Sequence, residues 1–206
     1  MMLAIAFACS TRVPSNVVDA ATAERECGEA GQQLALNSPA DVASLVGCTH
    51  LLGSLRIGDS LLANVDGLES LRAIDETVTF FRNPNLTSLE GLRSLERIGG
   101  DLNLNDNPGL IDLEGLRKLR EVGGWLLVKT EGALLTLHGL DALRTVGSLS
   151  IIVNPKLANI DALSAFQVVA GDLTITNNTA LAQSTALGFA TRITVGGKTD
   201  VADNGP

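Results

Sequence analysis

The feature that most constrains this chain is a repeat of 23 or 24 residues that begins near residue 54 and continues to residue 197. Each copy contains one short strand-like segment, and the second residues of these segments occupy positions 55, 78, 102, 126, 149 and 173. The segments read SLRI (54–57), TVTF (77–80), DLNL (101–104), WLLV (125–128), SLSI (148–151) and DLTI (172–175). A fixed period in this range predicts a solenoid, in which each coil buries its apolar edge against the next.

The remainder of each coil places an apolar residue at every third position. In the third coil these residues are Leu110, Leu113, Leu116, Leu119 and Val122. A spacing of three fits neither an α-helix nor a strand, but it fits extended or 3₁₀-like backbone. The pattern therefore predicts a mainly β protein, a parallel β-solenoid of about six coils. The sixth coil keeps the spacing with less bulk, as terminal repeats do (Leu181, Ser184, Leu187, Ala190, Ile193).

Two kinds of corner punctuate the coils. Asn-Pro follows the strand at 83–84, 107–108 and 154–155, and Asn178 takes the equivalent place later. Stacked Asn side chains there are expected to hydrogen-bond to the adjacent coil's backbone. The fourth coil has Thr130 and Glu131 instead, and the pattern alone offers no reason. Glycines at 99–100, 123–124 and 196–197 mark a second corner, where a positive φ is expected.

The segments that flank the repeat differ in character. Ser38 suits a helix N-cap, Pro39 the first helical position and Asp41 the reciprocal capping position. A capping helix is expected near 38–46, with Val42, Leu45 and Val46 on its apolar face. Residues 10–26 are expected to form a flexible tether, residues 27–197 the solenoid domain, and residues 198–206 a disordered tail.

The first nine residues, MMLAIAFAC, resemble the end of a bacterial lipoprotein signal, in which the Cys becomes lipid-modified. Cys9 would be the lipidated residue. The segment lacks a basic n-region, and its apolar run is short, so an untagged apolar N-terminus is the alternative. If processing uses Cys9, Cys27 and Cys48 remain as an even pair for a disulfide in an oxidising compartment, and two buried free thiols are the alternative.

The capped helix between Cys27 and Cys48, followed by GSLRI and by L-x-x-L-x-x-I coils, resembles the receptor L domain. This leucine-rich β-solenoid occurs in insulin- and epidermal-growth-factor-type receptors and in many bacterial surface proteins. The resemblance covers roughly residues 27–197 and implies a right-handed solenoid with a large parallel sheet available for binding. The chain shows no Cys-rich module, transmembrane helix or kinase, so receptor signalling is not implied.

Composition excludes several classes of function. The 23 Asp and Glu outnumber the 15 Lys and Arg, and no basic run occurs, which argues against a nucleic acid or an anionic membrane as the partner. Tyr is absent and the two His residues, His50 and His138, have no ligand cluster around them. The acids at 66, 90, 114 and 161 are expected to stack as a solvated column, with His138 in the same slot. No catalytic residue, metal site or cofactor is therefore expected.

The informative positions lie on the outward face of the strands. Since alternate strand residues point outward, the outward set is mostly small and polar, with four apolar exceptions: Phe81, Trp125, Leu127 and Ile152. If these form one apolar island, they are a binding site. The alternatives are that another segment or a partner copy covers them, or that WLLV has a different register.

The sequence thus favours a non-enzymatic, exported binding module that presents its strand face to a protein or a glycan at the cell surface. A membrane would be contacted only through a lipid anchor. A structural or spacer solenoid of the cell envelope without a specific ligand is the alternative.

Overall fold

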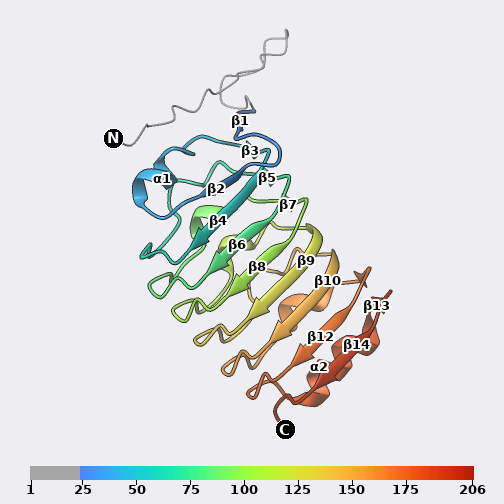
Figure 1. Cartoon of the computed structure of the whole chain (residues 1–206). Coiled ribbons are helices and arrows are strands. Elements are labelled where there is room, and N and C mark those ends of the chain that lie inside the picture. The colour runs from blue at the N-terminus through green and yellow to red at the C-terminus, as the bar shows by residue number, and fades with distance from the viewer. Residues whose placement is uncertain (1–23) are drawn as a thin grey trace.

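The computed structural model describes residues 24–206, and the lipidation site expected at Cys9 lies outside them, as do the signal segment and most of the expected tether. The described residues form one sheet of 14 strands with short helices beside it. Figure 1 shows the coils stacked along one axis, with the strands side by side on one face. Every strand pairing is parallel, so the predicted mainly β, solenoid-like architecture is confirmed.

The sheet contains two rows of strands. The longer row provides the broad face, and it comprises β2 (Gln33–Ala35), β4 (Ser54–Gly58), β6 (Val78–Phe81), β8 (Leu102–Asn105), β9 (Glu121–Lys129), β10 (Thr145–Ile152), β12 (Leu173–Thr176) and β14 (Thr199–Ala202). The shorter row comprises β1 (Glu26–Cys27), β3 (His50–Leu51), β5 (Ala73–Ile74), β7 (Arg97–Ile98), β11 (Val168–Val169) and β13 (Thr194–Val195). Because β9 and β10 are long, each takes part in both rows.

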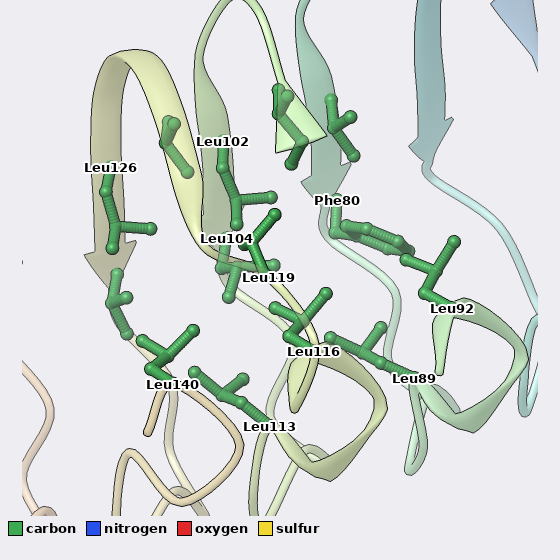
Figure 2. Close-up of a cluster of buried hydrophobic side chains, with 14 of the residues drawn as sticks. Phe80, Leu89, Leu92, Leu102, Leu104, Leu113, Leu116, Leu119, Leu126 and Leu140 are labelled. Atoms are coloured by element: carbon green, nitrogen blue, oxygen red, sulfur yellow. The ribbon is translucent and has the colours of Figure 1, made fainter. Parts of the chain in front are cut away.

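The core lies between the broad strands and the opposite wall of each coil (Figure 2). Leu102 and Leu104 of β8 are fully buried, as are the wall residues Leu113, Leu116 and Leu119. Three turns of 3₁₀-helix occur in this wall: η1 (Glu90–Leu92), η2 (Glu114–Leu116) and η3 (Asp161–Ala165). The every-third-residue spacing thus does correspond to 3₁₀-like backbone that returns an apolar side chain to the core.

The N-terminal end is closed by α1 (Pro39–Ala43). The expected capping box is present: the Ser38 Oγ accepts from the Asp41 backbone N–H at 3.3 Å, and the Asp41 carboxylate accepts from the Ser38 N–H at 2.8 Å. Val42 and Leu45 are buried, but Val46 is 53% exposed, so its assignment to the apolar face was wrong. The helix ends at Ala43, before Val46 could turn back to the core.

The C-terminal end differs from expectation in two ways. A ten-residue helix, α2 (Gln183–Arg192), replaces the period-three wall expected in the sixth coil, with Ala186 and Phe189 buried and Leu187 exposed. The disordered tail expected at 198–206 is also wrong, because Thr199–Ala202 forms β14 and pairs with β12. At the N-terminal end, Glu26 of β1 pairs with His50 of β3, so Glu26 belongs to the sheet and not to the tether expected at 10–26.

The glycines of the second corner have a different role from the one expected. Gly99 and Gly123 do not adopt positive φ; a Cβ at either would collide with a backbone oxygen of the preceding coil, so their role is to permit close coil stacking. Positive φ occurs instead at the residue that follows each broad strand from β4 to β14. These residues are Asp59, Arg82, Asp106, Thr130, Val153, Asn177 and Asp203.

Candidate functional site

The outward face of the broad sheet carries the candidate binding residues in the predicted register. Leu102 pairs with Leu126 in register, and Leu126 with Leu149, all three buried. The next residue on each strand therefore points outward, so Asn103, Leu127 and Ser150 lie side by side on β8, β9 and β10. Mostly small polar side chains cover this face, as expected for a solvated sheet.

Trp125 is the largest apolar residue exposed on this face, and 40% of its surface is accessible. Its indole N–H donates to the Ser150 Oγ at 3.0 Å, so the ring reaches diagonally across to β10. Ser150 is only 6% exposed as a result. The indole is thus held in one orientation before any partner arrives, which lowers the entropic cost of binding.

Leu127 and Ile152 extend the apolar surface beside Trp125. Leu127 is two residues further along β9, and Ile152 lies on β10, opposite Lys129 in register; both are half-buried. We call Trp125, Leu127 and Ile152 the β9–β10 patch. Asn103 and Asn105 border it on β8, and Thr176 borders it on β12. An apolar centre with a polar surround is the arrangement found in protein-binding surfaces.

Phe81 does not belong to this patch. In register, Phe81 pairs with Asn105 and Asn105 with Lys129, so a polar strand separates Phe81 from β9. The Arg82 guanidinium lies over the Phe81 ring, 4.5 Å from its centroid. Arg82 also pairs with Asp59 at 2.8 Å. The predicted single island is therefore divided, with Phe81 already engaged in a cation–π contact two strands away.

A row of side chains at the start of the broad strands explains why Trp125 is unusual. At this position, Thr77, Asp101, Ser148 and Asp172 each accept a hydrogen bond from a backbone N–H of the next coil. The Asp101 Oδ1, for example, accepts from the Trp125 N–H at 2.7 Å. Trp125 occupies the same row, but an indole cannot accept such a bond. The coil that begins with Trp125 therefore gives up an inter-coil bond that its neighbours make.

A second row of side chains follows the far end of the strands. We call it the corner ladder, and its members are Asn83, Asn107, Glu131, Asn154, Asn178 and Asn204. The expected bonds from Asn to the adjacent coil are confirmed, since the Asn83 amide donates to the Ile57 carbonyl at 3.0 Å and to the Asn107 Oδ1 at 2.8 Å. Gln183 of α2 ends the ladder by accepting from Asn204.

Glu131 is the one carboxyl in this ladder, and it is fully buried. Its two oxygens accept from the Asn107 amide at 2.8 Å and from the Asn107 backbone N–H at 3.1 Å. Burial raises the pKa of Glu131 to about 8; the Asn107 bonds oppose this rise, and the Asp106 carboxylate adds to it. The sequence pattern already marked Glu131 as an exception in the Asn series, but its burial could be learned only from the fold.

The acidic column expected along the wall is broken by cations. Glu90 accepts two bonds from the Arg117 guanidinium, at 2.8 and 2.9 Å, and these lower the pKa of Glu90. His138 contacts the Glu114 carboxylate at 2.8 Å and Asp141 at 3.2 Å. His138 is an exposed corner residue, as expected, and the acids of the column are not all free, because Arg117 binds Glu90 and His138 contacts Glu114.

The remaining predicted residues concern covalent and metal chemistry. Cys27 and Cys48 form a disulfide, with their Cα atoms 6.0 Å apart, which joins β1 to the segment after α1. Within residues 24–206, no group of three His, Cys, Asp or Glu side chains is placed to hold a metal ion. The same residues contain no helix with the length and apolar character needed to cross a bilayer.

Comparison with known proteins identifies the family of part of the chain. The sequence model of the receptor L domain matches residues 47–111, from the end of the N-terminal cap to the wall after β8. The resemblance drawn from the repeat is therefore confirmed over these residues. No curated protein matches the chain.

Proposed function

We propose that this receptor L domain solenoid is an exported binding module whose β9–β10 patch contacts a protein partner. The receptor L domain is a family of ligand-binding modules, and the match covers the coils directly before the patch. The disulfide supports export, because such bonds persist in oxidising compartments. Attachment to an envelope through Cys9 belongs to the same proposal and concerns residues outside those described.

The observation that carries the proposal is the exposure of Trp125 in a row that otherwise ties the coils together. Neighbouring coils place Thr, Asp or Ser there, and each gains a bond to the next coil. Trp125 gives up that bond and leaves an aromatic surface in water, with Leu127 and Ile152 alongside. Trp is among the residues that contribute most when a protein interface desolvates them.

Charge and polarity around the patch favour a protein over a glycan. Lys129 on β9 and Asp101, directly before β8, provide opposite charges at its two ends, and Asn103 and Asn105 provide amides along one side. This is the rim expected of a protein interface, in which the polar groups set the register and the apolar centre contributes affinity. A glycan partner remains a distinct outcome of the test below.

The test uses the full chain and a matched pair of variants. Trp125→Ser with Leu127→Ser removes the patch, and Arg56→Ser with Thr79→Ser alters the same face on β4 and β6. Native extracellular material is passed over each immobilised chain, retained proteins are identified by mass spectrometry, and the purified candidate is then titrated by calorimetry. We expect the patch variant to weaken binding by about 30-fold or more, as loss of a central Trp does, and the matched variant to bind as wild type.

Two controls distinguish the outcomes. Circular dichroism must show that both variants keep a cooperative thermal transition near that of the wild-type chain. Equal binding by the patch variant would overturn the proposal. Retention of defined oligosaccharides on an array without any protein partner would replace the protein with a glycan, and retention of neither would favour the structural spacer.

A further inference from the structure

The corner ladder follows a bonding rule that the Asn residues share. Each Asn uses its Oδ1 to accept from the preceding coil, where the donor is a ladder residue or, for Asn83, the Ser60 N–H, and its Nδ2 to donate to the next coil. Asn83, for example, donates to the Asn107 Oδ1 through both its backbone N–H, at 3.3 Å, and its side-chain amide, at 2.8 Å. Asn154 makes the same two bonds to Asn178, each at 3.1 Å. Two donors therefore point from each Asn towards the next coil.

Glu131 follows only half of this rule. It accepts both bonds from Asn107, as an Asn would. Towards the next coil, its backbone N–H donates to the Asn154 Oδ1 at 2.9 Å. The second donor, which an Asn supplies through its amide, is absent from an ionised carboxylate, because a carboxylate only accepts. A protonated carboxyl has one O–H and restores the missing donor.

The surroundings of Glu131 also favour the neutral form. Its side chain is fully buried, and the Asn107 amide faces it from the preceding coil, while the Asn154 Oδ1 of the next coil accepts from the Glu131 backbone N–H. The charged group that acts on it is the Asp106 carboxylate, from the corner after β8, and like charge disfavours ionisation. Of the described residues, no Lys, Arg or His forms an ion pair with Glu131. Lys129, two residues earlier in the chain, is exposed at the end of β9.

We propose that Glu131 is held protonated in the folded chain and makes the corner ladder a pH-sensitive junction. In its acid form, the junction continues the ladder from the coil of β8 to that of β10. When the carboxyl ionises, its negative charge is repelled by the Asp106 carboxylate and its O–H donor is lost, so the ladder is interrupted at that point. The regulation acts on the cohesion of the solenoid and does not depend on the binding patch.

The direction of the pH effect is opposite to that of an ordinary carboxylate. Glu131 titrates near 4.5 when exposed, and the fold raises its pKa to about 8. The folded state therefore binds an extra proton between these values, so the contribution of Glu131 to stability is complete below about pH 4.5 and is lost as pH rises towards about 8. Glu90 and Asp75, whose pKa values are lowered by Arg117 and His50, act in the opposite direction at low pH.

Because these groups overlap in a simple stability curve, the test compares variants at each pH. Thermal unfolding of the full wild-type chain is measured beside Glu131→Gln, which keeps the shape and carries a permanent donor. Glu121→Gln is the matched control, since Glu121 is an exposed carboxylate on β9, the strand that leads to Glu131. We expect the melting temperature of Glu131→Gln, relative to wild type, to rise by several degrees between about pH 5 and about pH 9, and Glu121→Gln to show no such trend. A constant difference for Glu131→Gln would overturn the proposal.

A direct measurement covers the case in which Glu131→Gln does not fold. The wild-type chain is labelled with ¹³C at the Glu carboxyl carbons, and their shifts are followed by NMR from about pH 4 to about pH 10. One Glu carboxyl is expected to remain protonated at pH 7 and to be absent from the spectrum of Glu131→Asn, which restores the residue found in the other coils. If every Glu carboxyl has ionised by about pH 6, the proposal is wrong.

Discussion

Two neighbouring coils of this solenoid, which begin with β8 and with β9, share a core and differ at both ends of the strand. Leu102 of β8 corresponds to Leu126 of β9, and both are fully buried. At the start of the strand, Asp101 bonds to the next coil, whereas Trp125 exposes an indole. At the far end, the β8 coil has the amide of Asn107, whereas the β9 coil has the carboxyl of Glu131. The two coils thus share the same buried residues, and they differ in the row at the start of the strands and in the corner ladder.

The largest expected effect lies in the shared interior. Leu102→Ala and Leu126→Ala each remove a fully buried side chain from a stack that is closed on both sides. Each is expected to lower the free energy of unfolding by about 2–5 kcal/mol, and by similar amounts, because the two sites are equivalent. Chemical denaturation of both variants checks this, and a clear inequality would show that the β9 coil is packed differently from the β8 coil.

The second-largest loss of stability is expected in the corner ladder of the β8 coil. Asn107→Ala removes one hydrogen-bond partner each from the Asn83 amide, the Phe80 carbonyl and the Glu131 carboxyl in a buried site. We expect a loss of about 2–4 kcal/mol, since buried polar groups without partners are costly. Asn103→Ala, on the outward face of the same strand, should change stability by less than about 0.5 kcal/mol. If the two substitutions lower stability equally, the corner ladder does not stabilise the fold more than an outward side chain does.

The smallest expected losses of stability concern Asp101 and Trp125, the residues at the start of the β8 and β9 coils. Asp101→Ala removes the acceptor for the Trp125 N–H and is expected to cost about 1 kcal/mol. Trp125→Ser loses some indole packing but gains a hydroxyl that can accept from the next coil, as Ser148 does. Its net cost is therefore expected to stay below about 1 kcal/mol. Thermal denaturation followed by circular dichroism measures both, since Trp fluorescence is lost with the only Trp in the chain.

The repeat was readable in the sequence because each coil buries the same positions. The strand register, the 3₁₀-like wall and the Ser38 capping box follow from local spacing, whereas the Cys27–Cys48 disulfide was expected only if Cys9 is used by processing. The α2 helix was missed because the period of three was extended into it. The core-facing residues Ala186, Phe189 and Ala190 of α2, with Ile193 directly after it, are in fact spaced three, one and three apart, which is typical of a helix face.

Other features depend on contacts that no single segment contains. The burial of Glu131 results from Asn107 and Asn154 on two other coils, and the orientation of Trp125 from Ser150 on β10. β14 could not be recognised in a polar tail, because its pairing with β12 supplies the hydrogen bonds that its composition does not suggest. Residues about 24 positions apart in the sequence thus contact each other in space. These contacts determine the burial and orientation of Glu131 and Trp125, and the repeat itself does not show them.

The most direct test of this comparison converts both exceptional residues to the type found in the neighbouring coils. The variant Trp125→Ser with Glu131→Asn gives the β9 coil the polar residues of its neighbours and leaves the core unchanged. Its free energy of unfolding, measured in urea at about pH 8.5, is expected to equal or exceed that of the wild-type chain, because the restored ladder offsets the lost indole packing. A loss of more than about 2 kcal/mol would contradict the account, since Trp125 and Glu131 would then be required by the fold itself.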